Sequence, residues 1–361
     1  MKKFYSLFLF LIFKEFCLNS PSKEYLELVN WITKNGGYIS PKLYPIENDK
    51  SNRYIIAKEK IYKNEKIIII PDSIMLSSMN KLMYNICRDA YALEREIFDF
   101  ECLVYFITLD LNNKKSFFSP YYNYFPKIIK KDYFLYLPEE IKIKLSKSEL
   151  GEKIRIGEKF FQKSLSPVKK IIKSQNLMDT FIESFILVSS RNFGRRGSYF
   201  EDVNSMVPYI DLLNHGNNYN VWFIFNDLKN IMTVFAIKDI EKGNEIINFY
   251  GKENNIALYS YYGFVIKDNI YHVTIHILVS GQSFTFSLNS SNDKDVLQKL
   301  DKIANKEKCN IKDAANILFN KLIEKKTYYE SIKTDFDNIN YIINEEKYII
   351  EMYIDILKKY I

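Results

Sequence analysis

Apolar positions along the chain recur with two different periods, and the period changes several times. Residues 23–34 carry apolar side chains at helical spacing, and the Asn-Gly-Gly sequence at 35–37 predicts the end of that helix. Two short apolar runs at 54–57 and 67–70 follow, joined by a polar turn, and they predict strands. The chain is therefore expected to begin with a helix and then paired short strands.

A long helical stretch interrupts these strands. Apolar residues recur at intervals of three or four from residue 89 to residue 111, and again across 139–193, where lysines occupy the exposed positions. An aromatic, proline-containing segment at 116–127 separates the two and predicts a loop. The pattern indicates a helical insert at about 85–195.

Short strands return after the insert. Apolar runs at 221–225, 231–236 and 245–250 predict three strands, the last of them entered through a Lys-Gly-Asn turn. Clean alternation of apolar and polar residues at 271–277 and 284–286 predicts two more.

The order of these elements excludes one common architecture. Beyond residue 292 the spacing is helical to the C-terminus. Few strands are linked by a single crossover helix, which argues against a doubly wound parallel sheet. No GxGxxG and no P-loop sequence occurs, so an ordinary nucleotide site is not expected. The pattern predicts a mixed α and β chain with a helical tail.

Composition and charge narrow the classes of function. Hydrophobic residues make up 47% of the chain and charged residues 26%, which indicates a folded protein with a sizeable core. The formal net charge of +7 suits a solvated surface or an acidic partner. No basic stripe interleaves with aromatic residues in a recognisable motif, so direct binding of nucleic acid is not expected.

Four cysteines and three histidines give no recognisable metal pattern. The cysteines are widely spaced, without a CxxC pair, so we expect neither a zinc site nor a disulfide framework. His272 and His276 are four residues apart within an alternating segment. Two ordinary strand residues explain this spacing better than a pair of metal ligands, and we expect no metal.

The N-terminus carries a targeting pattern. A basic start at residues 1–3 precedes an apolar run at 4–13, which is too short to span a bilayer. Residues 1–20 are interpreted either as a leader for a secretory or plastid-type route, or as a helix docked on a cytoplasmic or nuclear protein. No other stretch reaches eighteen apolar residues, so we expect no stable membrane insertion.

The most specific motifs lie in residues 207–265. VPYIDLLNHGNN (207–218), AIKDIEKGNEIINFYG (236–251) and NNIALYSYYGFV (254–265) follow one another. In order, they contain an Asn-His pair after an apolar run with an aspartate, a Gly-Asn-Glu turn, a strand-ending tyrosine and a Tyr-Gly-Phe. Ser-Arg-Asn-Phe at 190–193 belongs to the same set.

These motifs resemble the SET-domain protein methyltransferases, in the branch with a split SET domain typified by the Rubisco large-subunit methyltransferase. The resemblance covers roughly residues 25–270. It implies an α+β fold, with a SET domain of small antiparallel sheets at 23–268 and a mainly helical substrate-binding domain at 269–361. It also implies an S-adenosylmethionine-dependent protein-lysine N-methyltransferase acting on an unidentified protein substrate. We expect a monomer.

The resemblance also assigns roles to residues. It makes Tyr250 the catalytic tyrosine, at the point where the amine and the sulfonium of the cofactor meet. It assigns Asn214 and His215 to the cofactor's adenine and amino-acid end, Arg191 to cofactor or substrate, and Tyr262 to the substrate channel. Such an aromatic channel would lower the pKa of a lysine amine, because burial disfavours its charged form.

One element departs from the branch. Where the branch has Gly-x-Gly before its first strand, this chain has Ser51-Asn52-Arg53-Tyr54. Without glycine the backbone cannot approach a ligand as freely. One hypothesis is that the Arg53 side chain binds the cofactor's carboxylate instead. Two alternatives stay open: a catalytically inactive SET-like module that binds a protein, and a methyltransferase that modifies histidine.

Overall fold

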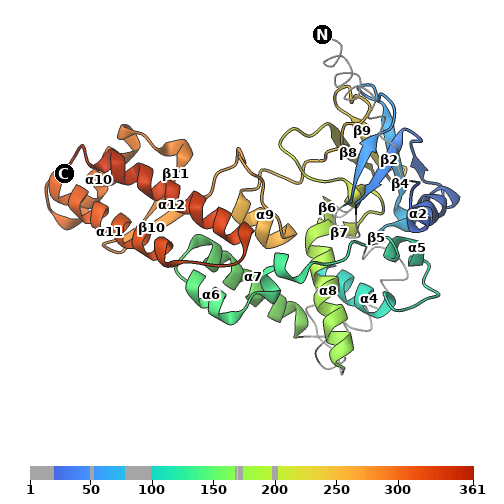
Figure 1. The fold of residues 1–361 in the computed structure, drawn as a ribbon, viewed down its shortest axis with the longest axis horizontal. Coiled ribbons are helices and arrows are strands. Elements are labelled where there is room, and N and C mark those ends of the chain that lie inside the picture. The colour runs from blue at the N-terminus through green and yellow to red at the C-terminus, as the bar shows by residue number, and fades with distance from the viewer. Residues whose placement is uncertain (1–19, 49–52, 78–98, 167–168, 170–173, 197–201) are drawn as a thin grey trace, which may run out of the picture. The chain divides into compact units, whose positions relative to one another are not determined.

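The computed structural model (Figure 1) describes residues 20–48, 53–77, 99–166, 169, 174–196 and 202–361. Residues 1–19 of the predicted leader therefore lie outside the described residues. So do Ser51 and Asn52 of the departing motif, and the start of the first helix of the insert.

Packing divides the chain into two compact units that alternate along the sequence. The first unit comprises Met1–Asn80, Leu109–Lys127 and Phe193–Phe249, and the second comprises Lys81–Thr108, Ile128–Asn192 and Tyr250–Ile361. The domain boundary expected between residues 268 and 269 stays a prediction.

The main sheet of the first unit has four antiparallel strands in the order β1-β4-β9-β8. Its strands are β1 (Tyr38–Ile39), β4 (Lys66–Pro71), β9 (Ile231–Ala236) and β8 (Val221–Asn226). On β9, Met232, Val234 and Ala236 are buried and the residues between them are not, as a period of two requires. The strands predicted for β4, β8 and β9 are confirmed.

Two smaller sheets contain the other strands that the structure describes in the first unit. One pairs β2 (Leu43–Glu47) with β3 (Arg53–Ala57), and the other has the order β5-β7-β6, from β5 (Leu76–Ser77), β7 (Asp202–Met206) and β6 (Asn192–Arg196). Strand β2 contains Pro45, which has no N–H to donate. A proline is tolerated there because β2 pairs with β3 alone.

Short helices flank these sheets. Helix α2 (Lys23–Lys34) has the predicted bounds: the Ser22 side chain caps it by accepting the Tyr25 N–H, and Asn35 ends it. Its buried face carries Tyr25, Leu28, Trp31 and Ile32. Helix α5 (Ser119–Tyr122) lies within the segment predicted as an aromatic loop.

Residues of the predicted insert that the structure describes form helices of the second unit. They are α4 (Asp99–Asp110), which ends at the border of the two units, α6 (Glu139–Leu145), α7 (Glu149–Leu165) and α8 (Gln175–Arg191). Helix α9 (Asn255–Tyr262) belongs to the same unit and ends at Gly263, which has a positive φ of 80°. Ser148 and Ser174 cap α7 and α8 through their side chains.

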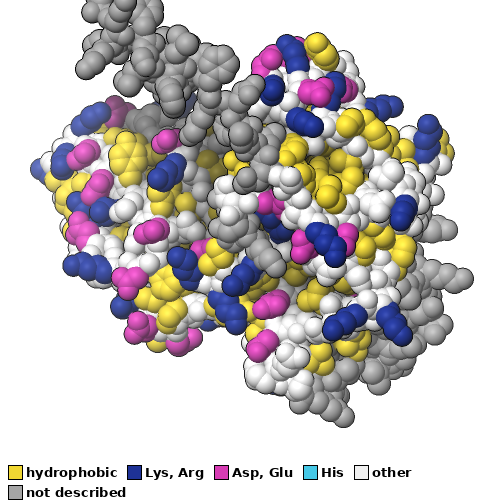
Figure 2. All heavy atoms as spheres, turned by 45° about the vertical axis from the view of Figure 1, so that its right-hand side comes forward, with side chains coloured by type: hydrophobic (Ala, Val, Ile, Leu, Met, Phe, Trp, Pro, Cys, Tyr) yellow, Lys and Arg dark blue, Asp and Glu magenta, His cyan; other side chains and the backbone are white. Residues whose placement is uncertain are grey.

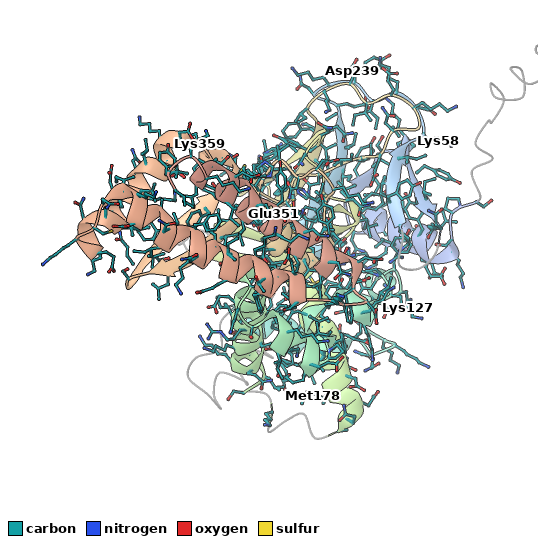
Figure 3. The ribbon with its side chains drawn as sticks, turned by 60° about the vertical axis from the view of Figure 1, so that its left-hand side comes forward. Lys58, Lys127, Met178, Asp239, Glu351 and Lys359 are labelled. Atoms are coloured by element: carbon teal, nitrogen blue, oxygen red, sulfur yellow. The ribbon has the colours of Figure 1, made fainter. Side chains whose placement is uncertain are left out.

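The C-terminal part of the second unit is a hairpin packed with three helices (Figure 1). Strands β10 (Thr274–Val279) and β11 (Gln282–Ser287) pair antiparallel, and α10 (Asp293–Glu307), α11 (Ile311–Ser331) and α12 (Asp337–Leu357) follow. The side chains of Glu351 and Lys359 (Figure 3) make ion pairs with Lys326 at 3.1 Å and Asp293 at 2.9 Å. The predicted helical tail is confirmed.

The cysteines differ from expectation in one respect. Cys102 of α4 is buried and disulfide-bonded, whereas Cys309 is free. Spacing along the sequence does not show which cysteines meet in space, and this is why the bond was not predicted. Cys17 and Cys87 lie outside the described residues.

The surface of the described residues carries mixed charge. On the face that Figure 2 shows, Lys and Arg side chains are interspersed with Asp and Glu. None of the helices in the described ranges is both long and apolar enough to cross a bilayer. Within those same ranges, no group of three or more His, Cys, Asp or Glu residues is arranged to hold a metal ion.

Gly151, in the first turn of α7, should not tolerate alanine. A Cβ there would lie 1.9 Å from the Leu145 carbonyl oxygen, which belongs to the backbone and cannot easily move. We expect Gly151→Ala to destabilise the protein by about 1–3 kcal/mol, because overpacking outweighs the gain in helix propensity. Thermal melts followed by circular dichroism would measure the loss.

Gly194→Ala is the matched control, because no atom of the described residues lies within 4 Å of the Cβ it would add. It should leave the melting temperature close to that of the wild type. An unchanged or raised melting temperature for Gly151→Ala would contradict the close contact with Leu145.

Candidate functional site

The segment at 245–250 was predicted as a strand, and this prediction is wrong. Its backbone forms isolated bridges with two different parts of the first unit. The Ile246 N–H donates to the Ile55 carbonyl at 2.8 Å, and the Asn248 N–H donates to the Asn214 carbonyl at 2.8 Å. The backbone of a regular strand forms a series of hydrogen bonds with the same neighbouring strand. In this segment the hydrogen bonds pass from residue 55 to residue 214 within two residues.

A buried asparagine fixes the same segment from a third side. The Asn220 side-chain amide donates to the Glu245 carbonyl at 2.7 Å, and its oxygen accepts the Ile247 N–H at 2.8 Å. Its backbone N–H donates to the Ile247 carbonyl at 3.0 Å. Asn220 was not singled out from the sequence, where it was one polar residue in an Asn-rich turn.

The predicted cofactor residues Asn214 and His215 lie together on the turn that this segment holds. The exposed Asn214 amide donates to a Glu245 carboxylate oxygen at 2.8 Å. Burial raises the pKa of Glu245, and the Asn214 bond opposes that rise. Burial lowers the pKa of His215, against a hydrogen bond to the Asn248 backbone, so its imidazole is neutral at pH 7.

Aromatic rings pack beside this turn. The ring of Phe249 lies 5.7 Å from that of His215 and stacks on Tyr219 at 4.8 Å. Phe249 is the residue before Tyr250 in the sequence. The last residue of the first unit in this segment therefore packs on His215.

Buried tyrosines hold the segment that precedes the Asn214–His215 turn. Tyr209 has a positive φ of 71°, which is strained for a bulky residue, and its hydroxyl shares a 2.7 Å hydrogen bond with that of Tyr25. Two residues on, the buried Asp211 accepts the Tyr121 hydroxyl at 2.7 Å. Strained backbone of this kind persists where the surroundings fix it, and it is frequent at functional sites.

In the second unit, Tyr250 packs against the predicted channel residue Tyr262. Their ring centroids are 4.9 Å apart at 40°, and Tyr262 also lies 6.1 Å from Phe264. Burial raises the pKa of Tyr262 to about 12, so its hydroxyl stays protonated at neutral pH. The structure therefore brings together the two tyrosines that the resemblance named.

Arg191, at the end of α8, interacts with Tyr133, whose ring lies beside Gly263, the residue after Tyr262. Burial raises the pKa of Tyr133, and the nearby Arg191 charge opposes that rise. A Cβ on Gly263 would lie 3.0 Å from the Tyr133 ring, so the residue after Tyr262 must be small. Tyr133 was missed, because one tyrosine among 28 carries no signal of its own.

Arg53 has a different environment. Its guanidinium carbon lies 4.3 Å from the centroid of the Tyr124 ring. The Tyr124 hydroxyl in turn donates to Glu47 at 3.0 Å, and Glu47 also accepts the Ser22 hydroxyl at 2.7 Å. The contact shown for Arg53 is thus a cation–π contact within the first unit. A role in holding the cofactor's carboxylate stays a prediction.

The sequence is similar to a known protein family and to several lysine methyltransferases. A family model of the SET domain matches residues 52–251. N-lysine methyltransferase SETD6 of Rattus norvegicus is 25% identical over 258 residues, covering 65% of this chain and 53% of that protein. Ribosomal lysine N-methyltransferase set11 of Schizosaccharomyces pombe is 22% identical over 253 residues, covering 67% and 61%. The chain thus spans between about half and two thirds of these relatives.

The fold resembles solved structures of Rubisco LSMT. The structure of Rubisco LSMT bound to AdoMet has a TM-score of 0.66 and 16% identity, and the match covers 94% of this chain and 92% of that one. Its SET domain bound to MeLysine and AdoHcy has a TM-score of 0.67. The predicted α+β fold, with small antiparallel sheets and a helical C-terminal region, is confirmed. Because the family model also spans more than half of the chain, this protein belongs to the SET domain family.

Proposed function

We propose that this protein is an S-adenosylmethionine-dependent protein-lysine N-methyltransferase. The observation that carries the proposal is the packed pair of Tyr250 and Tyr262; in sequence this pair begins directly after Phe249, whose ring packs on His215. SETD6 and set11 are both named as lysine methyltransferases, which supports lysine rather than histidine as the modified side chain.

The residues of the Asn-His turn have the chemistry that S-adenosylmethionine needs. The exposed Asn214 amide offers donors and an acceptor, and the neutral His215 offers a ring that can donate or accept. When bound, S-adenosylmethionine supplies an electrophilic methyl group on a sulfonium. In this proposal Asn214 and His215 hold the cofactor, and Asn220 keeps their turn fixed through residues 245–247.

The tyrosine pair has the chemistry that an incoming lysine needs. The ring faces of Tyr250 and Tyr262 attract the ammonium group. The largely buried surroundings of Tyr262 then favour the neutral amine, which is the nucleophile. The Tyr250 hydroxyl aligns that amine for in-line attack, so positioning supplies most of the rate. The reaction transfers the methyl group to the amine nitrogen and releases one proton.

One observation keeps the inactive alternative under test. Arg53, offered as the substitute for the missing glycines, lies on Tyr124. An SET-like module that holds a protein partner without the cofactor would fit that arrangement. The two functions differ in one measurable property, the affinity for S-adenosylmethionine.

Calorimetry on the full chain tests this property. We expect the wild type to bind S-adenosylmethionine and Asn214→Ala to lose about 10- to 100-fold in affinity, because each lost hydrogen bond of the site costs about 1–3 kcal/mol. Asn218→Ala is the matched control, since Asn218 is an exposed asparagine four residues away. Absence of binding by the folded wild type would favour the inactive module.

We further propose that the region at 269–361 contributes to recognition of the protein substrate and that the chain acts as a monomer. In the described residues this region is a hairpin and three helices, and its apolar core is shared with buried residues of α6, α7 and α9. Exposed side chains on these helices, such as Tyr348 and Leu297, are available to a protein partner.

A further inference from the structure

An open cavity lies among the helices of the second unit, and its lining does not include Arg191, Tyr250 or Tyr262. It has a volume of about 340 Å³. One face of α7 lines it with Lys153, Ile156, Gly157 and Phe160, which are spaced three, four and seven residues from the first. The other walls come from α4, α8 and α9 (Figure 1). We refer to this cavity as the α7 groove.

Part of the lining of the α7 groove is a cluster of three phenylalanines. The rings of Phe100 and Phe160 are 5.1 Å apart, and Phe185 lies 5.4 Å and 5.8 Å from them. The Phe134 ring lies close to Gly157, because a Cβ added to Gly157 would be only 2.7 Å from that ring. The groove is therefore shaped by packed side chains on several helices.

The rim of the groove exposes large apolar side chains to solvent. Ile156 is 50% exposed, Phe160 41% and Tyr261 44%. Isolated exposed apolar residues are common, but a contiguous set around a cavity is typical of an interaction site. The exposed rim favours the side chains of a macromolecule over a small ligand, because a small ligand would leave these rim residues in water.

One cation stands at the edge of the groove. The Lys153 ammonium donates to the Tyr261 hydroxyl at 2.7 Å and lies 4.5 Å from the centroid of that ring. Among the residues that the structure describes, Lys153 makes no ion pair, and it is the one charged residue in the lining of the groove. A partner with a carboxylate beside an apolar side chain would complement both features.

We propose that the α7 groove docks a segment of the protein substrate in which a large apolar side chain lies close to a carboxylate. The apolar side chain fills the space above Phe100, Phe160 and Phe185, and the carboxylate pairs with Lys153. This inference rests on the proposed function, which supplies a protein substrate. The groove would then add affinity and selectivity without touching the reacting atoms.

Fluorescence anisotropy with labelled nine-residue peptides tests this docking on the full chain. One peptide carries Phe with Glu four residues away, a second replaces Glu with Lys, and a third replaces Phe with Ala. We expect the Phe-Glu peptide to bind at least about tenfold more tightly than the other two, a difference of about 1.4 kcal/mol.

Charge reversal provides the decisive comparison. Lys153→Glu should lower the affinity for the Phe-Glu peptide about tenfold and raise the affinity for the Phe-Lys peptide. Phe160→Ala should lower the affinity for both peptides. Lys159→Glu is the matched control, because Lys159 is exposed on the same helix outside the groove and the change in net charge is identical. Melting temperatures confirm that each variant is folded.

Three results would overturn the docking site. The first is that no peptide binds at up to millimolar concentration. The second is that Lys153→Glu leaves peptide binding unchanged. The third is that the groove binds decanoate, a small molecule with an apolar tail and a carboxylate, but none of the peptides. Calorimetry with S-adenosylmethionine separates this failure from failure of the proposed function. If the protein binds the cofactor but no peptide, the docking proposal alone is rejected. If it binds the peptide but not the cofactor, the proposed enzymatic function is rejected and the docking proposal stands.

Discussion

Tyr250→Phe should reduce methyl transfer by about 100- to 1,000-fold, the cost expected when one positioned hydrogen-bonding group is removed from a reaction centre. The substitution keeps the ring that packs 4.9 Å from Tyr262 and removes the hydroxyl alone. We therefore expect the melting temperature and the affinity for S-adenosylmethionine to stay near the wild-type values. A loss confined to the rate would identify the hydroxyl as a catalytic group.

Transfer of a labelled methyl group to protein acceptors measures this effect. Tyr348→Phe is the control, because it removes the same atom from a residue that is 59% exposed on α12. Tyr262→Phe should cause a smaller loss, since the proposal gives that residue a wall of the channel. Full activity of Tyr250→Phe would sink the role assigned to its hydroxyl, although the protein could still be a methyltransferase.

Elements fixed by local signals could be predicted from the sequence. Helix α2 has the predicted bounds because Ser22 and Asn35 act on the residues next to them. Strands β8 and β9 were predicted from two short apolar runs, which are also local signals, and the structure pairs them antiparallel. The resemblance placed Tyr250 and Tyr262 in one channel, and the structure packs them together.

Features that depend on distant segments could not be predicted. The segment at 245–250 is a short apolar run after a turn, as a strand often is, but its hydrogen bonds go to residues near 55, 214 and 220. The link from Arg191 through Tyr133 to Gly263 also joins segments far apart in the chain. No local pattern encodes such a meeting, which only the packed chain creates.

A buried carboxyl group in the second unit should make stability depend on pH. Glu346 of α12 is fully buried, and its carboxylate accepts the Leu150 N–H at 3.2 Å. Burial raises its pKa to about 8, and the charge of Glu149 adds to the rise. The Leu150 N–H, together with Lys325 and Tyr329 of α11, opposes the rise. The folded protein therefore holds this carboxyl group protonated at pH 7.

The sign of the effect follows from proton binding. An unfolded glutamate loses its proton near pH 4.5, whereas folded Glu346 keeps it up to about pH 8. Between these values the unfolded chain binds fewer protons, so the free energy of unfolding falls by about 1.4 kcal/mol per pH unit for this group. Glu346→Gln removes the titrating proton and keeps an acceptor for Leu150. The variant should lose this slope and exceed the wild type in stability at pH 8.

Urea denaturation at pH 5, 6, 7 and 8 measures the slope. Far-ultraviolet circular dichroism is the appropriate signal, because both tryptophans, Trp31 and Trp222, belong to the first unit. Glu351→Gln, on the same helix, removes a partly exposed ion pair worth about 0–1 kcal/mol and should keep the wild-type slope. If Glu346→Gln showed the same pH dependence as the wild type, Glu346 would be ionised in the folded protein and Lys325 would be its counter-ion.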